Sequence, residues 1–84
     1  MRRISFTKHA DVKLELLKRH GFCVEQNFIE NCVNAPDKVE KGYGERKIAQ
    51  KVFDEGHVLR VVYEEKGDEI LVITVYPGRR SRYE

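Results

Sequence analysis

The sequence contains no long hydrophobic run. No segment approaches the ~20 consecutive apolar residues that a membrane-spanning helix requires. Residues 1–13 also lack the apolar stretch of a secretory signal peptide. We therefore expect a cytoplasmic protein that has no membrane contact.

Cysteine is scarce, and its spacing excludes the common cysteine-based sites. Cys23 and Cys32 form neither a C-x-x-C motif nor a zinc-like spacing. Nine residues apart on one helix, they would point to opposite sides, which argues against a mutual disulfide. We interpret Cys32 as a small hydrophobic residue of the core. His20 and His57 have no ligand-like neighbours, so we expect no metal and no cofactor.

The charges of the two signs nearly balance. The 16 Lys and Arg residues oppose 14 Asp and Glu residues, for a net charge of +2. Only the distribution of charge can therefore indicate a nucleic-acid partner. A hydrophobic content of 40% with 36% charged residues is typical of a globular protein. We predict one domain over residues 1–84, with residues 78–84 as a basic C-terminal tail.

Two helices are predicted near the N-terminus, after a short strand at residues 3–6. The first helix begins after its N-cap, Thr7, and ends before Gly21. The second is expected over residues 24–34, because the apolar residues of this segment share one helical face.

The rest of the sequence is interpreted as β-strands, in which successive side chains point to opposite faces. Three strands joined by glycine-containing turns are expected within residues 46–55, 57–66 and 69–77, and residues 38–42 add a short edge strand. The predicted fold class is therefore α+β, with two N-terminal helices packed on an antiparallel β-meander of three to four strands.

One face of this meander is expected to carry the helices. Its apolar residues are Leu59, Val61, Tyr63, Leu71, Ile73 and Val75. The opposite face is expected to be polar at one end and apolar at the other. It would carry Lys51, Val58, Arg60, Val62, Val72, Thr74 and Tyr76.

Three stretches of the sequence have a familiar pattern: FTKHA at residues 6–10, NAPDKV at 34–39 and LRVVYEEKGDEILVITVYPGRRSRYE at 59–84. Together they resemble a family of small uncharacterised domains related to the RelE/ParE toxin superfamily, over nearly the whole chain. The resemblance implies the same order of helices and meander. The superfamily includes ribosome-dependent mRNA endonucleases and gyrase-poisoning proteins that have no catalytic site. The resemblance therefore does not decide between an enzyme and a binding protein.

The pattern of the family matches a histidine before the first helix, His9, and an arginine in the penultimate strand, Arg60. A histidine at a helix start is a candidate general acid or base, or alternatively a structural cap. A long cation in mid-strand needs a solvated face or an anion. Arg60 therefore either stabilises charge in phosphoryl transfer or pairs with a carboxylate such as Glu40 or Glu64.

The C-terminal residues are basic and aromatic. Arginine suits bidentate contact with phosphate, and tyrosine stacks on unpaired bases. The alternative is a solvated, frayed end. The predicted catalytic residues are His9, Arg60 and Tyr83. The predicted nucleic-acid-binding residues are Lys51, Tyr76, Arg79, Arg80 and Arg82.

The leading functional hypothesis is a toxin-like protein of a toxin–antitoxin system that acts as a metal-independent RNA endonuclease. An RNA 2′-hydroxyl would attack the adjacent phosphate, with His9 or Tyr83 as the base and the cationic side chains as charge stabilisers. The expected partners are an antitoxin, RNA or the ribosome, and a second copy in a homodimer. The alternative hypothesis is a non-catalytic protein-binding module that uses its open sheet face or an edge strand.

Overall fold

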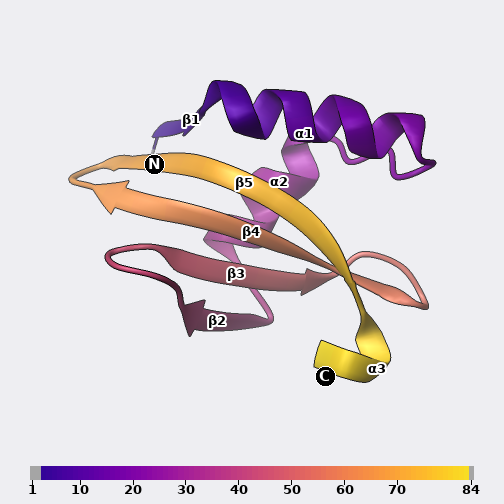
Figure 1. Ribbon diagram of the computed structural model, residues 1–84. Coiled ribbons are helices and arrows are strands. Elements are labelled where there is room, and N and C mark those ends of the chain that lie inside the picture. The colour runs from indigo at the N-terminus through magenta and orange to yellow at the C-terminus, as the bar shows by residue number, and fades with distance from the viewer. Residues whose placement is uncertain (1–2, 84) are drawn as a thin grey trace.

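A five-stranded mixed sheet forms the centre of the structure, with the strand order β1-β5-β4-β3-β2 (Figure 1). The computed structural model describes residues 3–83. The strands are β1 (Arg3–Phe6), β2 (Lys38–Lys41), β3 (Lys47–Val52), β4 (His57–Lys66) and β5 (Glu69–Arg79). The helices are α1 (Lys8–Arg19), α2 (Gln26–Asn34) and α3 (Arg80–Tyr83).

The predicted α+β class is confirmed, but the predicted arrangement is incomplete. Strands β2 to β5 form the antiparallel meander. The short strand β1 pairs in parallel with β5, so the sheet has five strands and not three or four. A third helix, α3, follows β5 and lies beyond its end (Figure 1).

Thr7 links the start of α1 to the sheet. Its side chain accepts a hydrogen bond from Ala10 N at 3.1 Å, as predicted for an N-cap. The same hydroxyl donates to the carbonyl oxygen of Ile73 in β5 at 2.9 Å. The helix ends at Arg19, and Gly21 follows with φ 90°, a left-handed conformation that glycine adopts without strain.

The helices α1 and α2 cover one face of the sheet and bury the core there. The core cluster comprises Ala10, Leu17, Ile29, Cys32, Val33, Ala49, Leu59, Val61, Tyr63, Ile70, Val72 and Val75. Cys32 is fully buried, as predicted, and its thiol donates to the carbonyl of Ala49 at 3.5 Å. Burial raises the pKa of the Cys32 thiol to about 12. Both cysteines are free, and Cys23 is exposed.

A β-bulge in β5 overturns part of the predicted face assignment. Val62 pairs with Thr74, but Tyr63 pairs with Val72, so Ile73 is an extra residue in β5. Between Ile73 and the N-terminal end of β5, the extra residue exchanges the side chains that face the helices for those that face the other way. Val72 and Ile70 therefore face the helices and are fully buried, whereas Leu71 and Ile73 are only partly buried.

The sequence contains no signal for this bulge, because residues 70–73 are all apolar and either set of alternate side chains could face the core. The carbonyl of the extra residue, Ile73, is the one that accepts the Thr7 hydroxyl. The N-cap of α1 thus also satisfies a polar group beside the bulge. Within residues 3–83, no helix is long and apolar enough to cross a membrane.

Candidate active site

Arg60 is the central residue of the sheet face that α1 and α2 leave uncovered, here called the open face. Its neighbours in β4, Leu59 and Val61, point into the core under the helices, so alternation directs Arg60 to the open face. The Arg60 side chain is nevertheless only 4% exposed. A buried guanidinium requires polar partners, and the neighbouring strands provide them.

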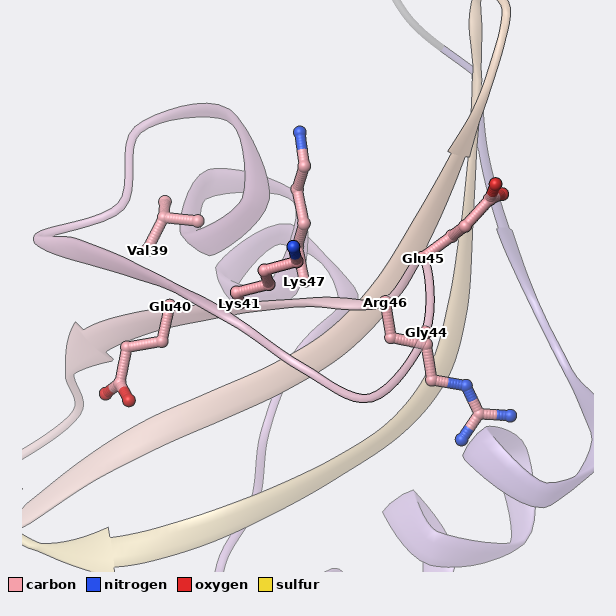
Figure 2. Close-up of a pocket in the computed structure, with 7 residues that line it drawn as sticks. All are labelled: Val39, Glu40, Lys41, Gly44, Glu45, Arg46 and Lys47. Atoms are coloured by element: carbon pink, nitrogen blue, oxygen red, sulfur yellow. The ribbon is translucent and has the colours of Figure 1, made fainter.

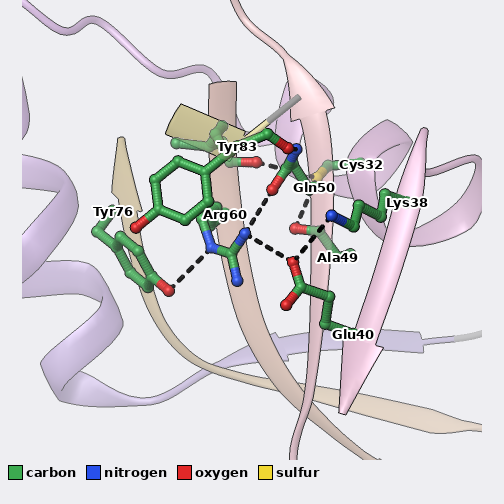
Figure 3. A network of polar contacts seen from close by, with 9 residues as sticks. Cys32, Lys38, Glu40, Ala49, Gln50, Arg60, Tyr76 and Tyr83 are labelled. Atoms are coloured by element: carbon green, nitrogen blue, oxygen red, sulfur yellow. Dashed lines mark hydrogen bonds and ion pairs between the residues drawn. The ribbon is translucent and has the colours of Figure 1, made fainter. Parts of the chain in front are cut away.

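Three side chains accept hydrogen bonds from Arg60 (Figure 3). Its Nε donates to Tyr76 Oη in β5 at 3.0 Å, and Nη1 donates to Glu40 Oε1 in β2 at 3.0 Å. The same Nη1 donates to Gln50 Oε1 in β3, directly opposite Arg60 in the strand pairing. Of the carboxylates considered from the sequence, Glu40 rather than Glu64 is therefore the partner.

The second terminal nitrogen of Arg60, Nη2, is the remaining donor of the guanidinium. In Figure 3 no dashed line joins it to another side chain. No residue between 3 and 83 is assigned as its partner, and no buried side-chain nitrogen of this part of the chain is left unsatisfied. Nη2 is therefore the guanidinium nitrogen for which no side-chain partner is found among residues 3–83.

The C-terminal helix α3 folds back over this cluster. The Tyr83 ring lies 4.3 Å from the guanidinium carbon of Arg60, and the Tyr76 ring lies at 5.8 Å. Gln50 Nε2 holds the backbone of α3 by donating to the Tyr83 carbonyl at 3.1 Å. Two aromatic rings and a carboxylate thus lie around the cation, an arrangement that stabilises its charge.

Gly78 provides the space into which Tyr83 packs. A Cβ atom at position 78 would lie 2.4 Å from the Tyr83 ring, closer than any ordinary contact. We expect Gly78→Ala to displace Tyr83 from Arg60 while leaving the core unchanged. The check is the side-chain NMR signals of Tyr83, which should lose their cation-induced shifts in the variant. Gly56→Ala is the matched control, because a Cβ there meets no atom closer than 3.9 Å; unchanged Tyr83 signals in Gly78→Ala would contradict this packing.

The charges of Glu40 and Arg60 stabilise each other. Burial lowers the pKa of Arg60, but its hydrogen bonds to Glu40 and Tyr76 outweigh burial, so that the pKa of Arg60 lies above its usual value. The hydrogen bond from Arg60, followed by its positive charge, lowers the pKa of the Glu40 carboxyl. Both groups are therefore ionised at neutral pH, and Glu40 remains half-exposed as a carboxylate.

The predicted tail is ordered along the turn between β3 and β4. Gly78 and Arg79 belong to β5, and Arg79 pairs with His57. Arg80 N donates to the Gly56 carbonyl at 3.0 Å. Arg79 and Arg82 line a hollow of about 570 Å³ next to Tyr83. Glu84, the last residue of the predicted tail, lies outside the described residues.

The structure does not bring His9 to Arg60. His9 is an exposed residue of the first turn of α1, in the helix layer, whereas the Arg60 side chain lies on the opposite face of the sheet. The two residues therefore share no cleft in this structure.

Lys51 was predicted on the same face as Arg60, and this placement is wrong. Lys51 pairs with Leu59 and points to the helix face, where its Nζ donates to the Ala35 carbonyl at 2.9 Å. The residue opposite Arg60 is Gln50. The sequence analysis already placed Gln50 and Lys51 on opposite faces of β3. Because paired residues of neighbouring strands lie on the same face, this alternation could have identified Gln50 as the partner of Arg60.

A second hollow, of about 480 Å³, lies along β2 and its loop to β3. Figure 2 shows the side chains of Glu40, Arg46 and Lys47 diverging from one another around it. They do not converge on a common point, as catalytic groups would. Residues 3–83 also hold no group of three His, Cys, Asp or Glu residues placed to bind a metal ion.

Two solved structures share this architecture, although no protein-family profile and no curated protein matches the sequence. The crystal structure of YafQ from E. coli strain BL21(DE3) aligns with a TM-score of 0.57 at 10% identity, covering 99% of this chain and 98% of YafQ. The chain has the fold of YafQ.

The solution structure of the conserved hypothetical protein HP0894 from Helicobacter pylori is also similar. It aligns with a TM-score of 0.53 at 15% identity, covering 96% of this chain and 97% of HP0894. Like the alignment with YafQ, this one shows a shared fold. Function must come from the site itself, because one fold serves many activities.

Proposed function

We propose that the protein is a toxin-like RNA endonuclease whose active site is the Glu40–Arg60 pair on the open face. One observation carries the proposal. A half-exposed carboxylate lies 3.0 Å from a guanidinium that is fixed by four other contacts and whose second terminal nitrogen has no side-chain partner among residues 3–83. A base next to a fixed cation is what cleavage of RNA by its own 2′-hydroxyl requires.

The reaction follows from the positions of the donors and acceptors. Glu40 takes the proton of the 2′-hydroxyl, and the 2′-oxygen attacks the adjacent phosphorus. Arg60 Nη2 donates to a phosphate oxygen and stabilises the charge that develops there. The bond from phosphorus to the 5′-oxygen breaks, leaving a 2′,3′-cyclic phosphate and a 5′-hydroxyl.

The leaving 5′-oxygen needs a proton, and Tyr76 can supply it. The Tyr76 hydroxyl accepts from Arg60 Nε, so its own hydrogen remains available for donation. Exchange with water then returns a proton to Tyr76 and removes one from Glu40, which restores both groups. His9 takes no part, because it lies on the other side of the sheet.

The neighbourhood of the pair suits a single-stranded RNA. Arg79 and Arg82 line the hollow beside Tyr83 and offer charge to flanking phosphates. The rings of Tyr76 and Tyr83 offer stacking surfaces to unpaired bases. An antitoxin that inhibits this site would have to cover Glu40 and Arg60.

The binding-module alternative is weakened at two positions of the open face. Val58 and Val62, which were expected to form an apolar patch there, are 1% and 9% exposed. These two valines therefore offer little apolar surface to a partner, although Val52, which pairs with Val58, is 37% exposed. The edge-strand form of the alternative is unaffected.

The test is cleavage of a labelled single-stranded RNA, free or on the ribosome, with a 2′-deoxy version as the substrate control. We expect Glu40→Gln to lower the rate at least ~10²-fold, because the base is lost while the side-chain shape is kept. Glu64→Gln is the matched control in β4 and should change the rate by no more than about twofold, because Glu64 has no contact with Arg60 in the described structure. No cleavage by the unmodified protein, or equal cleavage of the 2′-deoxy substrate, would overturn the proposal.

The pH profile gives an independent check on Glu40. Because Arg60 lowers the pKa of Glu40 below its usual 4.5, the carboxylate stays ionised as the pH falls to that value. The rate at pH 4.5 should therefore still exceed half of its plateau value. A rate that halves between pH 6 and 7 would instead indicate a histidine.

A further inference from the structure

The edge strand β2 has a charge pattern that is complementary to itself. From residue 37 to 41 the sequence reads Asp-Lys-Val-Glu-Lys. When this segment is laid antiparallel on a second copy with Val39 opposite Val39, Lys38 lies opposite Glu40 and Asp37 lies opposite Lys41. Every charged residue then faces a residue of opposite sign, an arrangement that stabilises adjacent strands.

The backbone groups along the outer edge of β2 can form hydrogen bonds to a second copy in the same Val39-centred register. The strand is the last in the sheet, and β3 pairs with only one of its sides. Gly42 N donates to Arg46 O, and by alternation the polar groups of Glu40 and Lys38 also point to β3. The N–H and C=O groups of Val39 and Lys41 therefore point away from β3. Across a two-fold axis, Val39 of one copy would then form a hydrogen-bonded pair with Val39 of the other copy.

The other symmetric registers are unfavourable. A two-fold axis of an antiparallel strand pair places one residue opposite its own copy. If that residue is Lys38, Glu40 or Lys41, like charges lie directly opposite each other. Val39 is the one uncharged residue of β2, and 49% of its surface is exposed.

We propose that β2 pairs with β2 of a second copy of this chain in the Val39-centred register and joins the two five-stranded sheets of a homodimer. Tyr43, two residues beyond the end of the strand, is 91% exposed. Isolated edge strands in monomers are commonly protected by lysines against such pairing. Here each lysine of β2 has an acidic partner across the axis. This inference does not depend on RNA cleavage.

A disulfide cross-link tests the register. In a hydrogen-bonded antiparallel pair the Cα atoms lie about 5.5 Å apart, within the range for a disulfide. Val39→Cys, in a Cys23→Ser background, should therefore form a covalent dimer under mild oxidation. Cys32 is buried and should not react. Val12→Cys, 50% exposed on α1, is the matched control and should remain monomeric.

Sedimentation equilibrium tests the charge pattern in solution. The unmodified chain should dimerise, and Lys41→Glu, which places like charges opposite each other at Asp37, should weaken the dimer at least about tenfold. The same charge change at the exposed hairpin residue Lys66 should have no effect. A monomeric unmodified chain, or equal cross-linking of Val39→Cys and Val12→Cys, would overturn the inference.

Discussion

Ile70→Ala is expected to lower the free energy of unfolding by ~2–5 kcal/mol, whereas Leu71→Ala should lower it by about 1 kcal/mol. The two residues are neighbours in β5 and lose a similar number of atoms in the two substitutions. They differ because the bulge at Ile73 turns Ile70 into the core and Leu71 to the opposite face. Ile70 is fully buried and Leu71 only partly.

Urea unfolding of the two variants measures this difference directly. The larger loss approaches the whole stability of a domain of this size, so Ile70→Ala should unfold at a much lower urea concentration. If Leu71→Ala proved the more damaging substitution, the strand would have the uninterrupted alternation that the sequence predicts, and the bulge would be wrong.

Arg60→Lys is expected to reduce RNA cleavage at least ~10²-fold, whereas His9→Ala should leave it within about twofold. Lysine keeps the positive charge but cannot contact Tyr76, Gln50, Glu40 and a phosphate at once, because it lacks the planar fork of nitrogen donors. His9 lies in the helix layer, away from the open face. The two variants thus separate the observed site from the one predicted from sequence.

The measurement is the initial rate of RNA cleavage by variants whose thermal unfolding is recorded in parallel. Arg60→Met provides the second variant, because it fills similar space without a charge and should cleave no faster than Arg60→Lys. A large loss in His9→Ala with an intact fold would return His9 to the mechanism and contradict the placement of the site.

The sequence was sufficient for the elements that depend on local signals. Thr7 as the N-cap, the stop near Gly21 and the end of α2 at Asn34 were predicted and are observed. The pairing of β1 with β5 was missed, because a parallel contact between the two ends of the chain leaves no local pattern. The bulge was missed for a similar reason. The carbonyl of its extra residue, Ile73, accepts a hydrogen bond from Thr7, which is 66 residues away along the chain.

The site was predicted only in part. Arg60 stood out because a cation in mid-strand needs an anion, and its partner proved to be one of the two carboxylates considered, Glu40. Gln50 was missed because a neutral amide carries no such signal. The docking of Tyr83 also required the structure, because it depends on the fit of one ring against Gly78.

The most direct test of the account is an NMR titration with a short 2′-O-methyl RNA, which binds without being cleaved because its 2′-oxygen carries no proton. The largest changes are predicted at Arg60 Nε and at the rings of Tyr76 and Tyr83, with His9 unchanged. Changes centred on α1 and His9, or no change at the Arg60 cluster at saturating RNA, would contradict the assignment of the open face as the active site.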